Sequence, residues 1–141
     1  MNLFIDANVL VAVLNREYPL FSDAARVLSL GQNSRFKLFT SPVCLAIAFY
    51  FSEKKSGSSL AKSKIALLVE HINIAPLNEN AVNLVINNKS IYDFEDGLEY
   101  FAALGADCKV IVTEDKNDFY FSEIPVFNCK QLLENISEFK K

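Results

Sequence analysis

The chain has 141 residues, of which 51% are hydrophobic and 22% are charged. This length and balance predict one globular domain spanning residues 1–141 and argue against a disordered chain. The formal net charge of −3 gives no overall basic field of the kind that favours nucleic-acid binding.

The sequence also argues against a membrane or secreted protein. The longest apolar run, Val43 to Phe51, has nine residues, about half of the roughly 20 that a membrane-spanning helix needs. No basic segment precedes the charge at Asp6, as a secretory signal would require. The three cysteines form no CxxC pair and fit free thiols of the core in a reducing compartment. We therefore expect a cytoplasmic protein.

The first third of the chain predicts two strands and two helices. The apolar run Asn2 to Ile5 indicates a buried strand, and Asp6 joins it to a helix through Val9 to Leu14. Ser22 is the expected cap of a helix that stops at Gly31. Phe36 to Thr40 alternates like a second strand.

Ser41-Pro42 is typical of a helix start, so Val43 to Lys55 is expected to be helical until the Ser/Gly break at 56–59. The apolar face of the next predicted helix contains Ile65, Leu68, Val69 and Ile72.

The second half continues the alternation. Its predicted elements are a short strand within Ile72 to Leu77, helices over Glu79 to Asn88 and Asp93 to Leu104, strands over Lys109 to Thr113 and Pro125 to Phe127, and a final helix over Cys129 to Phe139. Phe94, Leu98, Phe101 and Ala102 form the expected apolar face of the helix that Gly105 ends. Strands that alternate with helices predict an α/β fold whose mainly parallel sheet is covered on both faces.

Aspartates gather where ligands bind in such folds, beyond the carboxyl ends of the strands. Asp6 ends the first strand, and Asp115 and Asp118 follow the strand Lys109 to Thr113. Asp93 and Asp96 lie three apart, on one face of the first turn of a helix.

Carboxylates from separate parts of a chain repel one another unless a cation lies between them, and Mg²⁺ or Mn²⁺ suits oxygen ligands of this kind. Such an ion activates water and offsets charge on a phosphodiester, so the pattern favours phosphoryl hydrolysis. Without Asp6, Asp96, Asp115 and Asp118 the charge would be 14 − 13 = +1, so the acidic balance can be local to a site.

Four lysines flank the Ser/Gly break: Lys54, Lys55, Lys62 and Lys64. They could contact phosphates, but a solvated helix face is the favoured interpretation. His71, the only histidine, has no nucleophile beside it in the pattern and is expected to be structural or exposed.

With these residues in place, the sequence resembles the PIN domain family of nucleases, which includes VapC-type toxins. The segments that carry the resemblance are FIDANVL (4–10), TSPVCLA (40–46), DFEDGLEYFAAL (93–104) and VIVTEDKNDF (110–119), and together they span nearly the whole chain. The resemblance implies a three-layer α/β/α sandwich, frequent homodimers, an RNA substrate cleaved with Mg²⁺ or Mn²⁺, and for the toxins an antitoxin partner.

By position, Asp6, Asp96 and Asp115 resemble the family's catalytic acids, and with Asp118 its metal ligands. Asn8 and Thr113 resemble the polar residues that orient these carboxylates, whereas Asp93 matches less securely and is favoured as a helix cap.

The sequence departs from the family pattern at one acid, because Ile47 stands where the family usually has a glutamate in the helix after the second strand. Glu53 lies six residues later, about 240° around the helix, and cannot take its place.

The functional hypotheses are therefore a metal-dependent ribonuclease, favoured, and a PIN fold that has lost catalysis and binds RNA or protein. A phosphatase of the haloacid-dehalogenase kind would need a second Asp where Asn8 stands.

Overall fold

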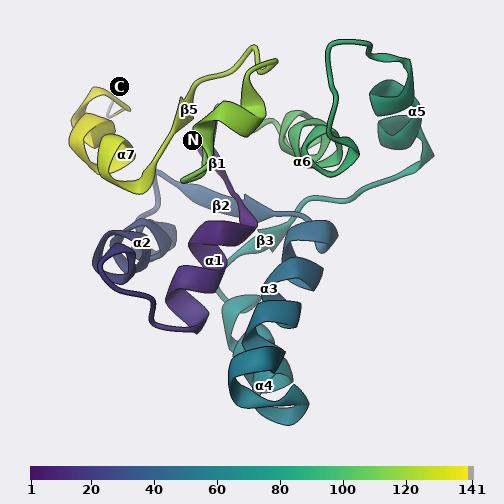
Figure 1. The fold of residues 1–141 in the computed structure, drawn as a ribbon. Helices are drawn as coiled ribbons and strands as arrows, with labels where there is room; N and C mark the ends of the chain where they lie inside the picture. Colours follow the sequence, from purple (N-terminus) through teal and green to yellow (C-terminus); the bar gives the residue numbers. More distant parts are fainter. Residues whose placement is uncertain (140–141) are drawn as a thin grey trace.

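The computed structural model describes residues 1–139, which form an α/β fold around a five-stranded parallel sheet of order β3-β2-β1-β4-β5. Figure 1 shows the sheet between helices, with α1 and α3 together on one side and α5 with α6 on the other. The strands are β1 (Asn2–Ile5), β2 (Lys37–Thr40), β3 (Asn73–Ile74), β4 (Val110–Val112) and β5 (Val126–Phe127). The predicted α/β class with a mainly parallel sheet is confirmed.

The helices follow the predicted order. They are α1 (Ala7–Leu14), α2 (Leu20–Ser29), α3 (Pro42–Ser56), α4 (Ser58–Leu68), α5 (Glu79–Asn87), α6 (Phe94–Gly105) and α7 (Cys129–Asn135), with 3₁₀ turns η1 (Leu30–Gln32), η2 (Lys116–Phe119) and η3 (Ile136–Phe139). None of the helices within residues 1–139 combines the length and the apolarity needed to span a bilayer.

The central strands β1 and β4 are buried except at the half-buried Asn2, because helices cover both faces of the sheet. Leu3, Phe4 and Ile5 of β1 and Ile111 and Val112 of β4 have 0% exposure. The chain moves from β1 to β2 and β3 on one side, then returns through α5 and α6 to β4 on the other side of β1. The carboxyl ends of β1 and β4 therefore form the switch point where open α/β sheets bind ligands.

Two helix starts match the sequence prediction in detail. Ser41 caps α3, where its side chain accepts a hydrogen bond from the amide of Cys44, and Pro42 is the first helical residue. Asp93 caps α6, where its Oδ1 accepts a hydrogen bond of 3.1 Å from the amide of Asp96. The favoured role of Asp93 as a cap is confirmed.

Three local predictions are wrong. Helix α2 begins at Leu20 after Pro19, so Ser22 lies inside it and caps nothing. Gly57 alone separates α3 from α4, since its positive φ of 84° turns the chain without a longer linker. The face expected on the helix from Asp93 to Leu104 is also wrong at one end, because Phe94 is 49% exposed.

Candidate active site

The end of β1 and the end of β4 bring two distant polar residues together. Ile5 pairs with Val112 in the parallel register, and the amide of Asp6 donates a hydrogen bond of 3.0 Å to the carbonyl of Val112. Asp6 and Thr113, each one residue beyond its strand, consequently lie side by side at the carboxyl edge of the sheet.

Asp6 is only 7% exposed, and both of its carboxylate oxygens accept hydrogen bonds. Oδ1 accepts from the amide of Ala7 at 2.6 Å, at the start of α1. Oδ2 accepts from the hydroxyl of Thr113 at 2.7 Å and from Nδ2 of Asn8 at 3.4 Å. Asp6 thus caps α1, and it also lines the acidic pocket described below.

Asn8 and Thr113 connect Asp6 to Asp115. Nδ2 of Asn8 donates to the hydroxyl oxygen of Thr113 at 3.0 Å and to Oδ2 of Asp115 at 3.2 Å, and its Oδ1 accepts from the amide of Glu114 at 3.2 Å. The hydroxyl oxygen of Thr113 also accepts from the amide of Asp115 at 3.1 Å. These contacts fix the positions of the two carboxylates relative to each other.

Helix α6 contributes further acids from across the pocket. Its capped first turn carries Glu95 and Asp96, and Glu99 follows one turn later. Gly97 lets α5 and the segment after it approach this turn closely, because a Cβ there would lie 2.7 Å from Cγ1 of Val85 in α5 and 2.8 Å from Cγ2 of Ile91 beyond it. The packing of α5 on Gly97 therefore sets where Asp96 lies.

These residues line one pocket of about 340 Å³ at the carboxyl edge of the sheet. Seven of its twelve lining residues are acidic: Asp6, Glu17, Glu95, Asp96, Glu99, Asp115 and Asp118. The other five are Ala7, Asn8, Val11, Ile47 and Phe51. The two ion pairs within residues 1–139 join Arg26 to Asp23 and Lys109 to Asp107, away from this pocket. The negative charge in the pocket thus has no basic side chain against it in the described part of the chain.

Burial and the neighbouring carboxylates raise the pKa values of several acids in this pocket. Burial, with the charges of Asp93 and Asp118, raises the pKa of Asp96 to about 7. Burial and the charge of Asp115 raise the pKa of Asp118, and burial and Asp93 raise that of Glu95. Raised carboxyl pKa values indicate uncompensated negative charge, which is the electrostatic setting that a divalent cation would relieve.

All four predicted metal ligands, Asp6, Asp96, Asp115 and Asp118, line this pocket. Asn8 and Thr113 make the hydrogen bonds described above, whereas the side chain of Asp93 accepts a hydrogen bond from the backbone amide of Asp96 at the start of α6.

Sequence reasoning missed Glu99, which is 1% exposed and lines the same pocket. Burial and the nearby charge of Asp6 raise its pKa to about 10. Its position three residues after Asp96 was a usable signal, because residues three apart share a helix face. The prediction for this helix considered its apolar face and its first-turn aspartates, and Glu99 belongs to neither.

The thiol of Cys44 belongs to the same cluster. All three cysteines are free and buried, as predicted, but Sγ of Cys44 lies 3.2 Å from Oε1 of Glu99 and 3.8 Å from Oδ1 of Asp6. Burial and these two carboxylates raise the pKa of the thiol well above its usual value. Cys44 therefore stays a neutral thiol that can donate to the acids.

Helix α3 presents Ile47 to the pocket where the resemblance leads one to expect a glutamate. Glu53 on the same helix is exposed and does not line the pocket. The carboxylates around the pocket therefore come from the end of β1, from the loop between α1 and α2, from α6 and from the segment after β4.

Two of the lysines considered as phosphate contacts hold helices together instead. Nζ of Lys64 donates to the carbonyl of Leu14 at 3.1 Å and to Oγ of Ser56 at 3.0 Å, and Lys55 donates to the carbonyl of Asn15. These bonds fasten α3 and α4 to the carboxyl end of α1, where carbonyl groups lack helical partners.

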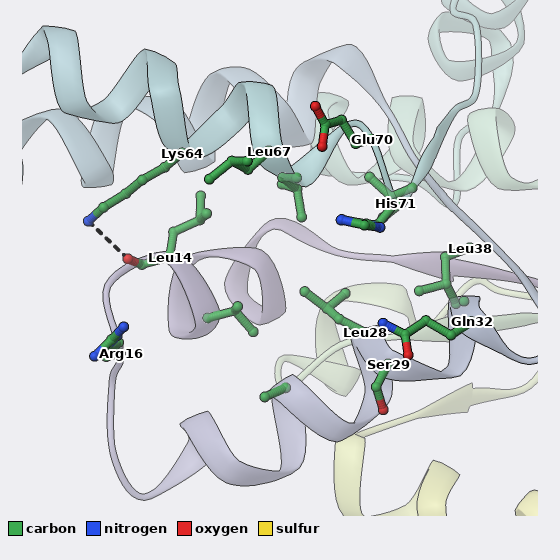
Figure 2. Close-up of a pocket in the computed structure, with 15 residues that line it drawn as sticks. Leu14, Arg16, Leu28, Ser29, Gln32, Leu38, Lys64, Leu67, Glu70 and His71 are labelled. Carbon is green, nitrogen blue, oxygen red and sulfur yellow. Dashed lines mark hydrogen bonds between the residues drawn. The ribbon is translucent and has the colours of Figure 1, made fainter.

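A larger pocket of about 720 Å³ lies elsewhere, between α1, α2 and α4. Figure 2 shows Leu14, Leu28, Leu38 and Leu67 along its walls, with the hydrogen bond from Lys64 to Leu14 at one end. Its ionisable residues are Arg16, Lys64, Glu70 and the exposed His71, which do not form a carboxylate cluster. This pocket is lined mainly by apolar side chains, whereas the other pocket is lined mainly by carboxylates.

Comparisons with known proteins find relatives by sequence and by structure. A family model described as PIN domain matches residues 2–117. The chain is also 27% identical over 136 residues to Ribonuclease VapC1 of Aquifex aeolicus, covering 94% of this chain and 93% of that protein.

Solved structures with a similar fold include VapBC2 from Rickettsia felis bound to a DNA fragment from their promoter (TM-score 0.68, 16% identity, 91% of this chain and 98% of the other). VapBC-1 from nontypeable Haemophilus influenzae has a TM-score of 0.69 at 18% identity, with coverage of 92% and 99%. VapC20 of Mycobacterium tuberculosis, described as a sarcin-ricin loop cleaving toxin, has a TM-score of 0.65 at 14% identity, with coverage of 86% and 98%.

Proposed function

The chain belongs to the PIN domain family, and on this premise we propose that it is a metal-dependent endoribonuclease, the toxin of a toxin–antitoxin pair. The observation that carries this proposal is the convergence of Asp6, Asp96, Asp115 and Asp118 on one pocket without a basic partner in residues 1–139. The homology to Ribonuclease VapC1 supports RNA as the substrate.

The donor set fits a hard divalent cation. Carboxylate oxygens are the ligands that Mg²⁺ and Mn²⁺ prefer, and the raised pKa of Asp96 marks charge that such an ion would offset. Asp6, Asp96, Asp115 and Asp118 are the proposed ligands. When bound, the ion would stabilise charge on the scissile phosphodiester and lower the pKa of a water.

The protein's own residues keep the carboxylates in place. Thr113 and Asn8 donate to Asp6, and Asn8 also reaches Asp115, so two proposed ligands are oriented before any ion binds. The cap at Asp93 fixes the first turn of α6 and therefore the backbone of Asp96. Preorganisation of this kind lowers the free-energy cost of assembling the charged site.

The proposed protein partner is an antitoxin. Two proteins of similar fold were solved as VapBC assemblies. The apolar pocket of Figure 2, with Leu67 62% exposed on its wall, has the chemistry to receive an apolar segment of such a partner. It is separate from the acidic pocket in its lining residues.

One observation favours a second function, a PIN fold that binds RNA without cleaving it. Ile47 presents an apolar side chain to the acidic pocket, so α3 gives no carboxylate there. On this hypothesis the protein would slow the migration of RNA in a mobility-shift assay. The RNA would stay intact with or without Mn²⁺, and Asp6→Asn would behave like wild type.

The proposed function is tested by induced expression in bacterial cells. We expect the wild-type chain to arrest growth with fragmentation of cellular RNA, and Asp6→Asn to do neither at equal protein level. Co-expression of the protein encoded beside it in its genome should restore growth. Growth arrest by Asp6→Asn as strong as by wild type would refute the proposed activity.

A further inference from the structure

Glu99 is the most deeply buried acid of the pocket, with a 1% exposed side chain on α6. Its Oε1 accepts a hydrogen bond of 3.2 Å from the thiol of Cys44. Its Oε2 is buried and has no hydrogen-bond partner among residues 1–139. One oxygen of Glu99, one oxygen of Asp6 and the sulfur of Cys44 all lie within 4.8 Å of one another.

A buried carboxyl oxygen without a hydrogen-bond partner lowers stability, and more so when the carboxyl group is charged. The interior rarely keeps such a group unless something satisfies it. Glu99 is on the wall of the acidic pocket, beside Asp6 and one helical turn from Asp96. Glu99 therefore brings to the wall of this pocket a carboxyl group with one oxygen that has no hydrogen-bond partner among residues 1–139.

We propose that Glu99 is a ligand of the divalent cation in this pocket, so that α6 supplies two carboxylates and replaces the acid that α3 lacks at Ile47. This inference rests on the proposed function for the presence of the ion, and goes beyond it by assigning a ligand from the protein interior.

Cys44 is then a positioning residue for Glu99. Its neutral thiol donates to Oε1, which leaves Oε2 as the free oxygen of the carboxylate. Helix α3 holds the thiol in turn, because the amide of Cys44 donates a hydrogen bond to the side chain of Ser41, which caps this helix. Hydrogen bonds behind a metal ligand commonly alter metal affinity by about 10–100-fold.

The alternative role for Glu99 is structural, a neutral acid that only fills space in the core. The two roles differ in Mn²⁺ affinity, which can be measured without any RNA from the electron paramagnetic resonance signal of free Mn²⁺. Glu95→Gln is the matched control, because Glu95 lies on the same helix and in the same pocket but is exposed. It removes one negative charge without removing a buried oxygen.

We expect Glu99→Gln to weaken Mn²⁺ binding by about tenfold or more, and Glu95→Gln to weaken it by much less. Glu99→Asp, which keeps the acid but withdraws it by one methylene, should also weaken binding and serves if Glu99→Gln does not fold by circular dichroism. Equal Mn²⁺ affinity of wild type and the Glu99 variants, or equal losses from Glu95→Gln and Glu99→Gln, would overturn the assignment.

Asp6→Asn separates this inference from the proposed function. If Asp6→Asn loses Mn²⁺ while the Glu99 variants retain it, the metal site stands and the role of Glu99 is wrong. If the wild-type chain itself binds no Mn²⁺, both the metal site and the ligand assignment are wrong.

Discussion

The hydroxyl of Thr113 donates a 2.7 Å hydrogen bond to Oδ2 of Asp6 and joins the ends of two neighbouring parallel strands. The two residues are 107 positions apart in the chain. Thr113 is fully buried, and its oxygen also accepts hydrogen bonds from Asn8 and from the amide of Asp115. A single hydroxyl group therefore aligns the carboxylates on both sides of the strand junction.

Replacing Thr113 with valine keeps the shape of the side chain and removes this hydroxyl. We expect Thr113→Val to lower the free energy of unfolding by about 1–3 kcal/mol, because buried polar partners lose their hydrogen bonds, and to reduce RNA cleavage. Urea unfolding and a cleavage assay measure the two effects. Thr113→Ser, which keeps the hydroxyl, should retain most activity, and equal activity of Thr113→Val and wild type would contradict the proposed alignment.

The pKa of Asp96 gives a prediction for stability against pH. Its folded value of about 7 lies above its ordinary value of 3.8, so the folded state binds more protons than the unfolded state between these values. In the metal-free protein the contribution of Asp96 to stability should therefore be complete below about pH 4 and be lost as the pH rises to about 7. Burial raises the pKa of Glu99 to about 10, so Glu99 also contributes less to stability as the pH rises.

Urea unfolding in the presence of a chelator measures this dependence. Asp96→Asn should flatten the fall in stability between about pH 4 and pH 7. The same pH dependence in Asp96→Asn and wild type would show that Asp96 does not titrate as described. Asn keeps the size of the side chain, so packing changes little.

Gly97 gives a prediction about packing. A Cβ at this position would approach Val85 and Ile91 to 2.7 and 2.8 Å, and overpacking of this kind costs about 1–3 kcal/mol. Gly97→Ala should lower the melting temperature and, by shifting the first turn of α6, reduce Mn²⁺ affinity. Gly105→Ala on the same helix is the control, because nothing lies within 4 Å of its Cβ position. Equal melting temperatures for the two variants would contradict this packing.

Ile47 tests whether another carboxylate improves the pocket. Ile47→Glu adds an acid to its lining, so we expect lower stability without metal and tighter Mn²⁺ binding than in wild type. Ile47→Leu keeps the apolar lining and should leave Mn²⁺ affinity unchanged. Thermal unfolding with and without Mn²⁺ compares the two variants, and no gain in Mn²⁺ stabilisation for Ile47→Glu would contradict the prediction.

The sequence predicted the fold well because its signals were local and redundant. Apolar runs marked the buried strands, and Ser41 and Asp93 marked helix starts through side chains that do cap α3 and α6. Ser22 failed as a cap because Pro19, three residues earlier, takes the N-cap position of α2 without any side-chain hydrogen bond. A serine at position 22 is compatible with a cap, but the residue type alone does not show whether the helix begins there or after Pro19.

The pocket could be predicted only in part. Asp6 and Asp115 follow parallel strands, whose carboxyl ends meet at one edge of a sheet, so their proximity followed from the strand pattern. Glu99 could not be found in that way, because an acid in the middle of a helix is usually solvated and its burial depends on tertiary packing. Cys44 was predicted to be buried, but its contact with Glu99 needs the placement of α3 against α6.

The most direct test of the central claim is cleavage of a single-stranded RNA by the purified protein with Mn²⁺ or Mg²⁺ and with chelator, alongside Asp6→Asn. We predict that the wild-type chain cleaves the RNA only when a divalent ion is present, and that folded Asp6→Asn does not cleave it. Cleavage that survives the chelator, or that Asp6→Asn performs at the wild-type rate, would contradict a nuclease centred on these acids.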